Sequence, residues 1–104
     1  MERIAFKMKI NSGAAEEYKK RHDEIWPELK SFLKTNGIYD YAIFLDESTN
    51  DLFAILKVED PKKLDTLPAN EIMQKWWLYM KDIMECNPDN SPVSQPLKEV
   101  FHLP

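Results

Sequence analysis

The first residues of the chain alternate between apolar and polar side chains. In RIAFKMKI, over residues 3–10, the large apolar side chains fall on one side and the basic side chains on the other. Such a period of two predicts a β-strand with one buried face. The stretch IYDYAIFLD, over residues 38–46, predicts a second strand in the same way. Four large side chains are expected to share one face of that strand: Tyr39, Tyr41, Ile43 and Leu45.

Two longer stretches show helical spacing of their apolar residues. Residues 14–36 predict a helix that ends at Asn36-Gly37, a pair that favours a helix C-terminus. Pro27 lies inside this stretch, and its ring clashes with the carbonyl of Asp23 in a continuous helix. We therefore expect a kink or two short helices. Residues 70–84 predict a further helix, since apolar side chains recur there every three or four positions.

The remaining stretches complete the order of a known motif. Residues 52–58 are apolar on both sides and predict a central strand. A short helix from Asp60 to Pro68, a polar loop over 87–96 and a strand over 97–103 are expected to follow. The order β-α-β-β-α-β predicts an α+β, ferredoxin-like fold in one domain over residues 1–104. Because helices cover only one face of such a sheet, the apolar residues on both sides of the strands predict a homodimer whose sheets pack face to face.

The composition excludes several classes of function. With only two glycines and a net charge of −4, the chain has no glycine-rich phosphate loop and no basic surface for nucleic acid or an anionic membrane. Two histidines and one cysteine cannot build a four-ligand zinc site, so we expect neither a metal nor a cofactor. The single cysteine, Cys86, and the lack of a long apolar run predict a cytoplasmic protein.

His22 is the side chain best suited to proton transfer near neutral pH, because an unperturbed imidazole has a pKa of about 6.5. Tyr18 precedes it and Trp26 follows it at helical spacing, so one helix stripe would carry an aromatic, a histidine and an aromatic. The alternative is a partly buried, hydrogen-bonded histidine near the helix kink. The neighbouring charges, which run from Glu16 to Arg21, are expected to form a solvated helix face.

Trp76 and Trp77 are a second candidate feature. Their indoles could stack on the C–H face of a sugar and donate to a hydroxyl, or they could form an aromatic helix face packed on the sheet. Tyr41 could present its hydroxyl to the same cleft, or it could be a tyrosine with its hydroxyl at the surface. We expect His102 to be structural or interfacial, and the polar loop 87–93 to be mainly structural.

Several stretches taken together resemble the L-rhamnose mutarotase family. They are Tyr18-Lys-Lys-Arg-His22, Ile25-Trp-Pro-Glu-Leu29, Tyr41-Ala-Ile43, Trp76-Trp-Leu-Tyr-Met80, Asn87-Pro-Asp-Asn-Ser-Pro-Val93 and the closing Glu99-Val-Phe-His-Leu-Pro104. The resemblance covers essentially the whole chain. It implies a dimeric α/β barrel and an isomerase of the aldose 1-epimerase type, which interconverts the α and β anomers of L-rhamnose without a cofactor.

The resemblance also implies roles for particular residues. His22 would be the proton donor, and the sugar contacts would be Tyr18, Tyr41, Trp76 and Trp77. Asp23-Glu24 stand where that family often has Asn-Pro, and they would raise the pKa of His22 if their carboxylates lie close to it. Two other functions stay open: a haem-binding or quinol-type monooxygenase of the same barrel group with His22 as an axial ligand, and a non-catalytic sugar-binding domain.

Overall fold

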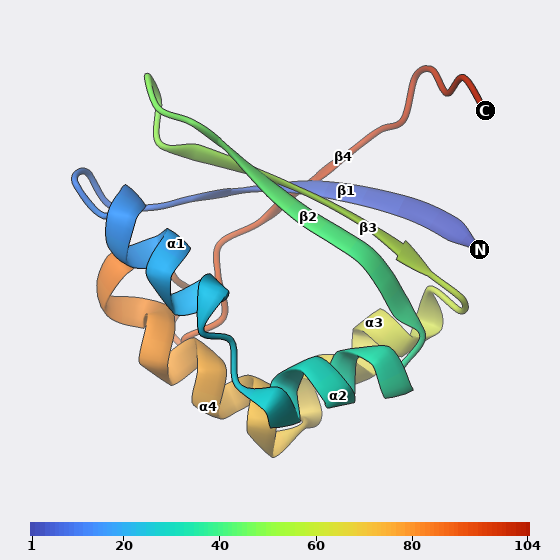
Figure 1. Cartoon of the computed structure of the whole chain (residues 1–104), viewed down its shortest axis with the longest axis horizontal. Coiled ribbons are helices and arrows are strands. Elements are labelled where there is room, and N and C mark those ends of the chain that lie inside the picture. The colour runs from blue at the N-terminus through green and yellow to red at the C-terminus, as the bar shows by residue number, and fades with distance from the viewer.

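The strands form one antiparallel sheet in a computed structural model that describes residues 1–104 (Figure 1). Along the chain the elements are β1 Glu2–Lys9, α1 Ala15–Asp23, α2 Pro27–Thr35, β2 Ile38–Asp46, β3 Asp51–Val58, α3 Lys62–Thr66, η1 Leu67–Ala69, α4 Glu71–Met80, η2 Lys81–Ile83 and β4 Gln95–Leu97. The strands lie in the order β2-β3-β1-β4, and every neighbouring pair is antiparallel. The predicted α+β, ferredoxin-like fold is confirmed.

The core lies between the inward face of the sheet and the helices, which gather on one side of it in Figure 1. Every second residue of β3 is buried, as the alternation of a strand requires: Leu52, Ala54, Leu56 and Val58. Leu29 of α2 and Met80 of α4 pack against this face in the main hydrophobic cluster. None of the helices is long and apolar enough to cross a bilayer.

The stretch around Pro27 forms two helices, which is one of the two predicted outcomes. α1 ends at Asp23, and α2 begins with Pro27 at its first position, where the missing N–H has no helical partner to lose. Trp26 between them is extended, with φ −60° and ψ 131°. The break therefore removes Trp26 from the stripe of α1. The predicted helix over 70–84 is also shorter, because α4 ends at Met80 and a 3₁₀ turn follows.

A β-bulge in β2 changes the predicted face of one tyrosine. Regular pairing is interrupted between Tyr39 and Ala42, and Asp40 within the interruption has a positive φ of 49°. Because the extra residue at a bulge reverses the alternation, Tyr39 lies opposite Lys57 on the outward face. The prediction that Tyr39 shares a face with Tyr41 is therefore wrong. The other members of the predicted set do point inward: Tyr41, Ile43 and Leu45.

The last strand lies earlier in the chain than predicted. β4 pairs with residues 5–7 of β1, whereas residues 98–104 pair with no strand and turn away from the sheet (Figure 1). Most of the predicted strand 97–103 is therefore absent, because no neighbouring backbone supplies its hydrogen bonds. Val100 is 88% exposed and Phe101 and Leu103 are each 78% exposed. The apolar side chains of this C-terminal tail, residues 98–104, are therefore not buried by other parts of the chain.

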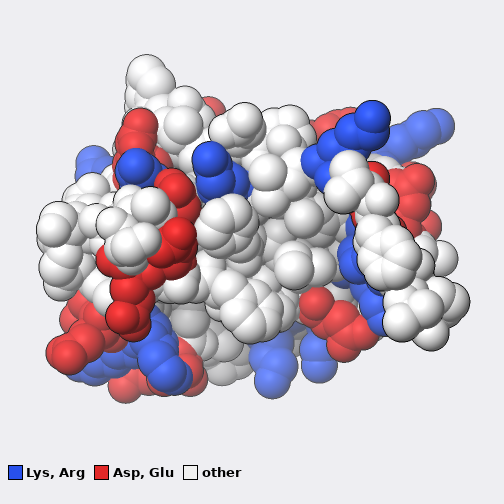
Figure 2. All heavy atoms as spheres, turned by 90° about the horizontal axis from the view of Figure 1, so that it is seen from above, with Lys and Arg blue, Asp and Glu red and all other residues white.

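The outward face of the sheet is also largely apolar. Phe44 of β2 is 64% exposed, and Ile55 of β3 and Leu97 of β4 are exposed on the same side. Figure 2 views the molecule from this side: uncharged residues fill most of the middle, and charged side chains gather mainly toward the margins. An apolar patch of this kind is typical of a surface that a partner covers.

Candidate functional site

A cleft of about 1040 Å³ lies between the inward face of the sheet and helices α1, α2 and α4. Most of its lining is apolar, which is usual for a site that binds a small molecule. All five residues singled out in the sequence line it: Tyr18, His22, Tyr41, Trp76 and Trp77. Residues from two helices and one strand are thus brought to one cavity by the fold.

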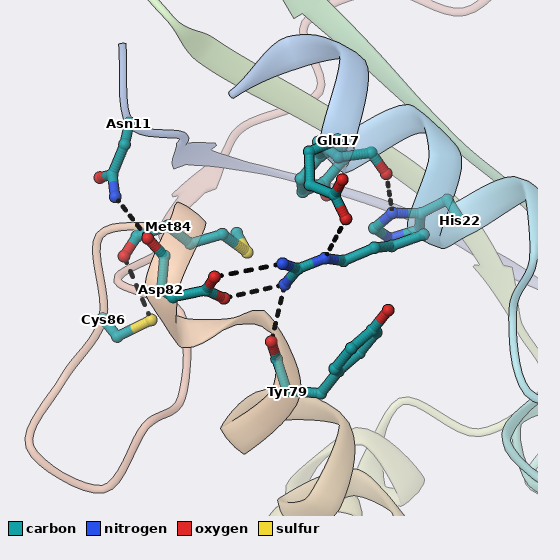
Figure 3. Close-up of polar contacts among 9 residues, drawn as sticks. Asn11, Glu17, His22, Tyr79, Asp82, Met84 and Cys86 are labelled. Carbon is teal, nitrogen blue, oxygen red and sulfur yellow. Dashed lines mark hydrogen bonds and ion pairs between the residues drawn. The ribbon is translucent and has the colours of Figure 1, made fainter. Parts of the chain in front are cut away.

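His22 has a defined hydrogen-bonding state. Its Nδ1 lies 2.9 Å from the backbone carbonyl oxygen of Tyr18, one helical turn earlier (Figure 3). A carbonyl oxygen can only accept, so Nδ1 carries the hydrogen and donates it. The other ring nitrogen, Nε2, has no hydrogen-bond partner in the chain. A neutral His22 therefore presents Nε2 as a free proton acceptor.

Two aromatic rings enclose the imidazole. The Tyr18 ring stacks on it with centroids 4.3 Å apart and an angle of 29°, and Trp76 meets it edge-on at 5.5 Å and 88°. The predicted partner Trp26 is not beside His22: it packs on Trp76 at 5.0 Å and on Tyr79 at 5.5 Å. The predicted helix stripe of Tyr18, His22 and Trp26 is therefore right for Tyr18 and wrong for Trp26, because the helix break before Pro27 moves Trp26 away from the face of α1 that carries His22.

Burial lowers the pKa of His22 below its usual value. The hydrogen bond to the Tyr18 carbonyl and the charge of Asp23 act in the opposite direction, but they are smaller effects. Asp23 points its carboxylate at Lys19, with 2.9 Å between the Lys19 Nζ and one carboxylate oxygen. Asp23 therefore does raise the pKa of His22, as expected of a nearby carboxylate, but burial lowers that pKa by more.

The two tyrosine hydroxyls stay protonated throughout the neutral range. Desolvation raises the pKa of Tyr18, and the nearby Tyr41 adds to that shift. Desolvation also raises the pKa of Tyr41 to about 12. Tyr41 still has 41% of its surface exposed, so a ligand in the cleft can reach it. Both groups can thus donate hydrogen bonds to a ligand in the cleft, while neither can serve as a base near pH 7.

The two tryptophans occupy different environments. Trp76 is buried in the main core and contacts the rings of His22, Trp26 and Tyr79, so it is both a core residue and a wall of the cleft. Trp77 is only half-buried and lines the cleft as well as a smaller depression of about 440 Å³ beside α4. Trp77 therefore has the more accessible ring for stacking on a ligand.

Other sequence candidates lie outside this cleft. His102 is exposed in the C-terminal tail. In the loop 87–93, Asn87 donates to Ser91 at 3.1 Å, and the Ser91 N–H donates to Asp89 at 3.0 Å, so these polar groups organise the loop itself. No group of three or more His, Cys, Asp or Glu side chains is gathered as a metal site.

Arg21 departs most from the sequence interpretation. It was expected on a solvated helix face, yet its side chain is only 11% exposed. It donates to Glu17 of its own helix and to Tyr79 and Asp82 beyond it (Figure 3). No local pattern could have indicated this, because the partners lie about sixty residues further along the chain.

Comparison with known proteins identifies close relatives. The family model described as L-rhamnose mutarotase matches residues 3–103. An L-rhamnose mutarotase from Formosa agariphila is 58% identical over 99% of both chains, and one from Listeria monocytogenes is 56% identical with the same coverage. The crystal structure of an L-rhamnose mutarotase from Formosa agariphila superposes with a TM-score of 0.93, at 57% identity and full coverage of both chains.

A more distant structure shares the fold alone. The crystal structure of an antibiotic biosynthesis monooxygenase superposes with a TM-score of 0.61 at 13% identity, covering 95% of this chain and 98% of that one.

Proposed function

The chain belongs to the L-rhamnose mutarotase family, and from this we infer that it is an isomerase that interconverts the α and β anomers of L-rhamnose. We assign the activity to a single domain over residues 1–104. The reaction opens the pyranose ring to the aldehyde, rotates the C1–C2 bond and closes the ring on the other face. Ring opening removes a proton from the C1 hydroxyl and adds one to the ring oxygen. Proton transfer is thus the only chemistry required, and the reaction needs no metal or cofactor.

We propose that His22 carries both proton transfers. Its free Nε2 accepts the proton of the C1 hydroxyl. The imidazolium so formed then donates a proton to the ring oxygen as the ring opens. Both oxygens are bonded to C1, so one imidazole can serve both without a large movement. Ring closure repeats these transfers in reverse, and His22 ends in the neutral state in which it began.

The remaining cleft residues hold the sugar. Tyr18 and Tyr41 keep their protons and donate hydrogen bonds to sugar oxygens, because desolvation holds both pKa values far above neutrality. Trp77 offers its ring to the C–H face of the pyranose, and Trp76 closes the wall behind His22. The largely apolar lining excludes water and strengthens each polar contact.

One observation carries this proposal: Nδ1 of His22 is committed to a backbone carbonyl while Nε2 is left free in a cleft walled by aromatic rings. The test is saturation-transfer NMR of L-rhamnose, which measures exchange between the α and β signals. Adding the protein at micromolar concentration is expected to accelerate exchange well above the spontaneous rate. Exchange at the spontaneous rate with clear sugar binding would instead indicate a non-catalytic sugar-binding domain.

We also propose that the chain acts as a homodimer. The exposed apolar face of the sheet, with Phe44 and Ile55, and the apolar C-terminal tail both support it. Arg3 and Glu99 form an ion pair at 2.8 Å that holds the start of the tail beside β1. A second copy placed face to face would cover the sheet and give Val100 and Phe101 an apolar surface to contact.

We place the activity in the cytoplasm. The single cysteine, Cys86, is free, so the fold is stabilised by its hydrophobic core and not by an internal disulfide. Cell fractionation with an antibody to the protein tests this location directly.

A further inference from the structure

Arg21 is the one residue of α1 whose side chain hydrogen-bonds another element. The other side-chain hydrogen bonds of α1 stay within the helix: Lys19 to Asp23, Arg21 to Glu17 and His22 to the Tyr18 carbonyl. α1 also has no side-chain cap at its N-terminus. The helix that carries Tyr18 and His22 is therefore tied to α4 and η2 by polar contacts of a single guanidinium.

That guanidinium uses its donors on four acceptors at once. Arg21 Nη1 lies 2.7 Å from the Tyr79 carbonyl oxygen and 2.8 Å from Asp82 Oδ1, while Nη2 lies 3.1 Å from Asp82 Oδ2. Its Nε donates to Glu17 at 2.8 Å. The Tyr79 carbonyl belongs to the last turn of α4, where carbonyls lack helical partners, so Arg21 also caps α4. The fork shape of the guanidinium makes this set of bonds possible.

The acceptor side is itself held in place. The Asn11 side chain donates to the Asp82 carbonyl at 3.1 Å, as Figure 3 shows, and the Asn11 N–H donates to the Ile83 carbonyl at 2.8 Å. The guanidinium also lies 4.5 Å from the centroid of the Tyr79 ring, and Tyr79 contacts Trp76 at 5.7 Å. A continuous path of contacts therefore runs from Arg21 through Tyr79 and Trp76 to His22.

We propose that Arg21 is a positioning residue for the reaction: by binding Tyr79 and Asp82, it fixes the helix that carries His22 and Tyr18 against the helix that carries Trp76 and Trp77. It does not touch the sugar. The proposal rests on the role assigned to His22 and extends it. A displacement of about 1 Å at a reacting group can lower a rate by about 10²-fold, so a link of this kind has a measurable effect on turnover.

The test compares Arg21→Met, which keeps an unbranched apolar stem but removes the guanidinium that bonds Tyr79 and Asp82, with Arg21→Lys and with the control Lys75→Met. Lys75 pairs only with Glu71 of its own helix, at 3.4 Å. We expect Arg21→Met to lower kcat for rhamnose exchange by about 10- to 100-fold with a smaller change in KM. The kcat of Arg21→Lys should lie between those of Arg21→Met and wild type, since an ammonium cannot reach all four acceptors. Lys75→Met should match wild type.

A second readout follows the His22 ring by NMR titration. The groups that face it are Tyr18, Asp23 and the neutral Trp76 ring; burial lowers its pKa, and the charge of Asp23 opposes that shift. If α1 is no longer held against α4, His22 should be less buried, and its pKa should rise toward about 6.5. Arg21→Lys keeps the positive charge, so a rise in that variant reports geometry and not charge.

The outcomes separate the two proposals. A folded Arg21→Met protein with wild-type kcat and an unchanged His22 titration would overturn the role of Arg21. So would a loss confined to thermal stability, which indicates a purely structural role. If Arg21→Met does not fold, kcat, the His22 titration and thermal stability are measured on Asp82→Asn instead, and the same results would overturn the role of Arg21. If His22→Ala keeps full activity, the role of His22 fails, while the titration still reports whether Arg21 fixes α1.

Discussion

His22 is a residue whose surroundings select one chemical form. The Tyr18 carbonyl accepts its Nδ1 hydrogen, and burial favours the neutral ring. We therefore expect His22→Ala to slow α/β exchange by about 10²- to 10⁴-fold, which is the usual contribution of a positioned acid or base. This corresponds to about 3–5 kcal/mol of transition-state stabilisation. Saturation-transfer NMR measures the rate, and ligand-observed NMR should show that rhamnose still binds. Near wild-type exchange by a folded variant would refute the assignment.

The lowered pKa of His22 sets the pH dependence of the rate. The proposed mechanism starts from the neutral ring, and a lowered pKa keeps the ring neutral to more acidic pH than a free imidazole. The catalysed rate should therefore be constant around neutral pH and fall as the pH decreases through a value below about 6.5. A pH series of exchange rates, corrected for spontaneous mutarotation, measures this decrease in rate at acidic pH. A fall that begins at clearly higher pH would contradict a neutral, buried His22.

Adjacent tryptophans should respond differently to the same substitution. Trp77 is half-buried at the cleft, so Trp77→Ala is expected to raise KM at least several-fold while the fold is retained. Trp76 is buried among core residues, so Trp76→Ala is expected to lower the free energy of unfolding by about 3–5 kcal/mol. Urea denaturation and exchange kinetics on both variants measure the two effects. Equal losses of stability in the two variants would contradict the assignment of Trp76 to the core and Trp77 to the cleft.

At the scale of single elements, the end of α2 depends on a glycine that is restricted in two ways. Gly37 has a φ of +77°, and a Cβ placed there would lie 3.1 Å from the Cβ of Glu59. Gly13 has a similar φ of +81° but has no atom within 4 Å of such a Cβ. Gly13→Ala should therefore lose about 1–2 kcal/mol of stability from backbone strain alone. Gly37→Ala should lose more, because Glu59 must also move. Urea denaturation of both variants tests this, and equal losses would rule out the contribution from Glu59.

At the scale of the whole molecule, the apolar outward face of the sheet makes the oligomeric state testable. Phe44→Lys places a charge in the middle of the proposed interface, and it should convert the dimer into monomers of 12.3 kDa. Sedimentation velocity at micromolar concentration distinguishes the two species. Leu78→Lys is the matched control, because Leu78 is also exposed but lies on α4, on the helical side. A wild-type chain that sediments as a monomer would refute the homodimer.

Local pattern was sufficient for much of the fold. The period of two located β1 and β2, a short continuous apolar run located β3, and the chemistry of proline located the break before Pro27. These signals depend on residues that are neighbours in the sequence, so no tertiary information is needed to interpret them. The aromatic and histidine residues of the cleft were found in the same way, because their chemistry marks them whatever their surroundings.

Only the tertiary structure decided how those residues meet. Trp76, and not Trp26, lies beside His22, and the partner of Arg21 is Asp82, about sixty residues away. The direction of the His22 pKa shift also depends on burial by several elements at once, which outweighs the raising effect of the neighbouring Asp23. These properties arise from packing and desolvation between segments that are distant in the chain. A sequence determines which groups are present and their local geometry, whereas the environment of each group exists only once the chain has folded.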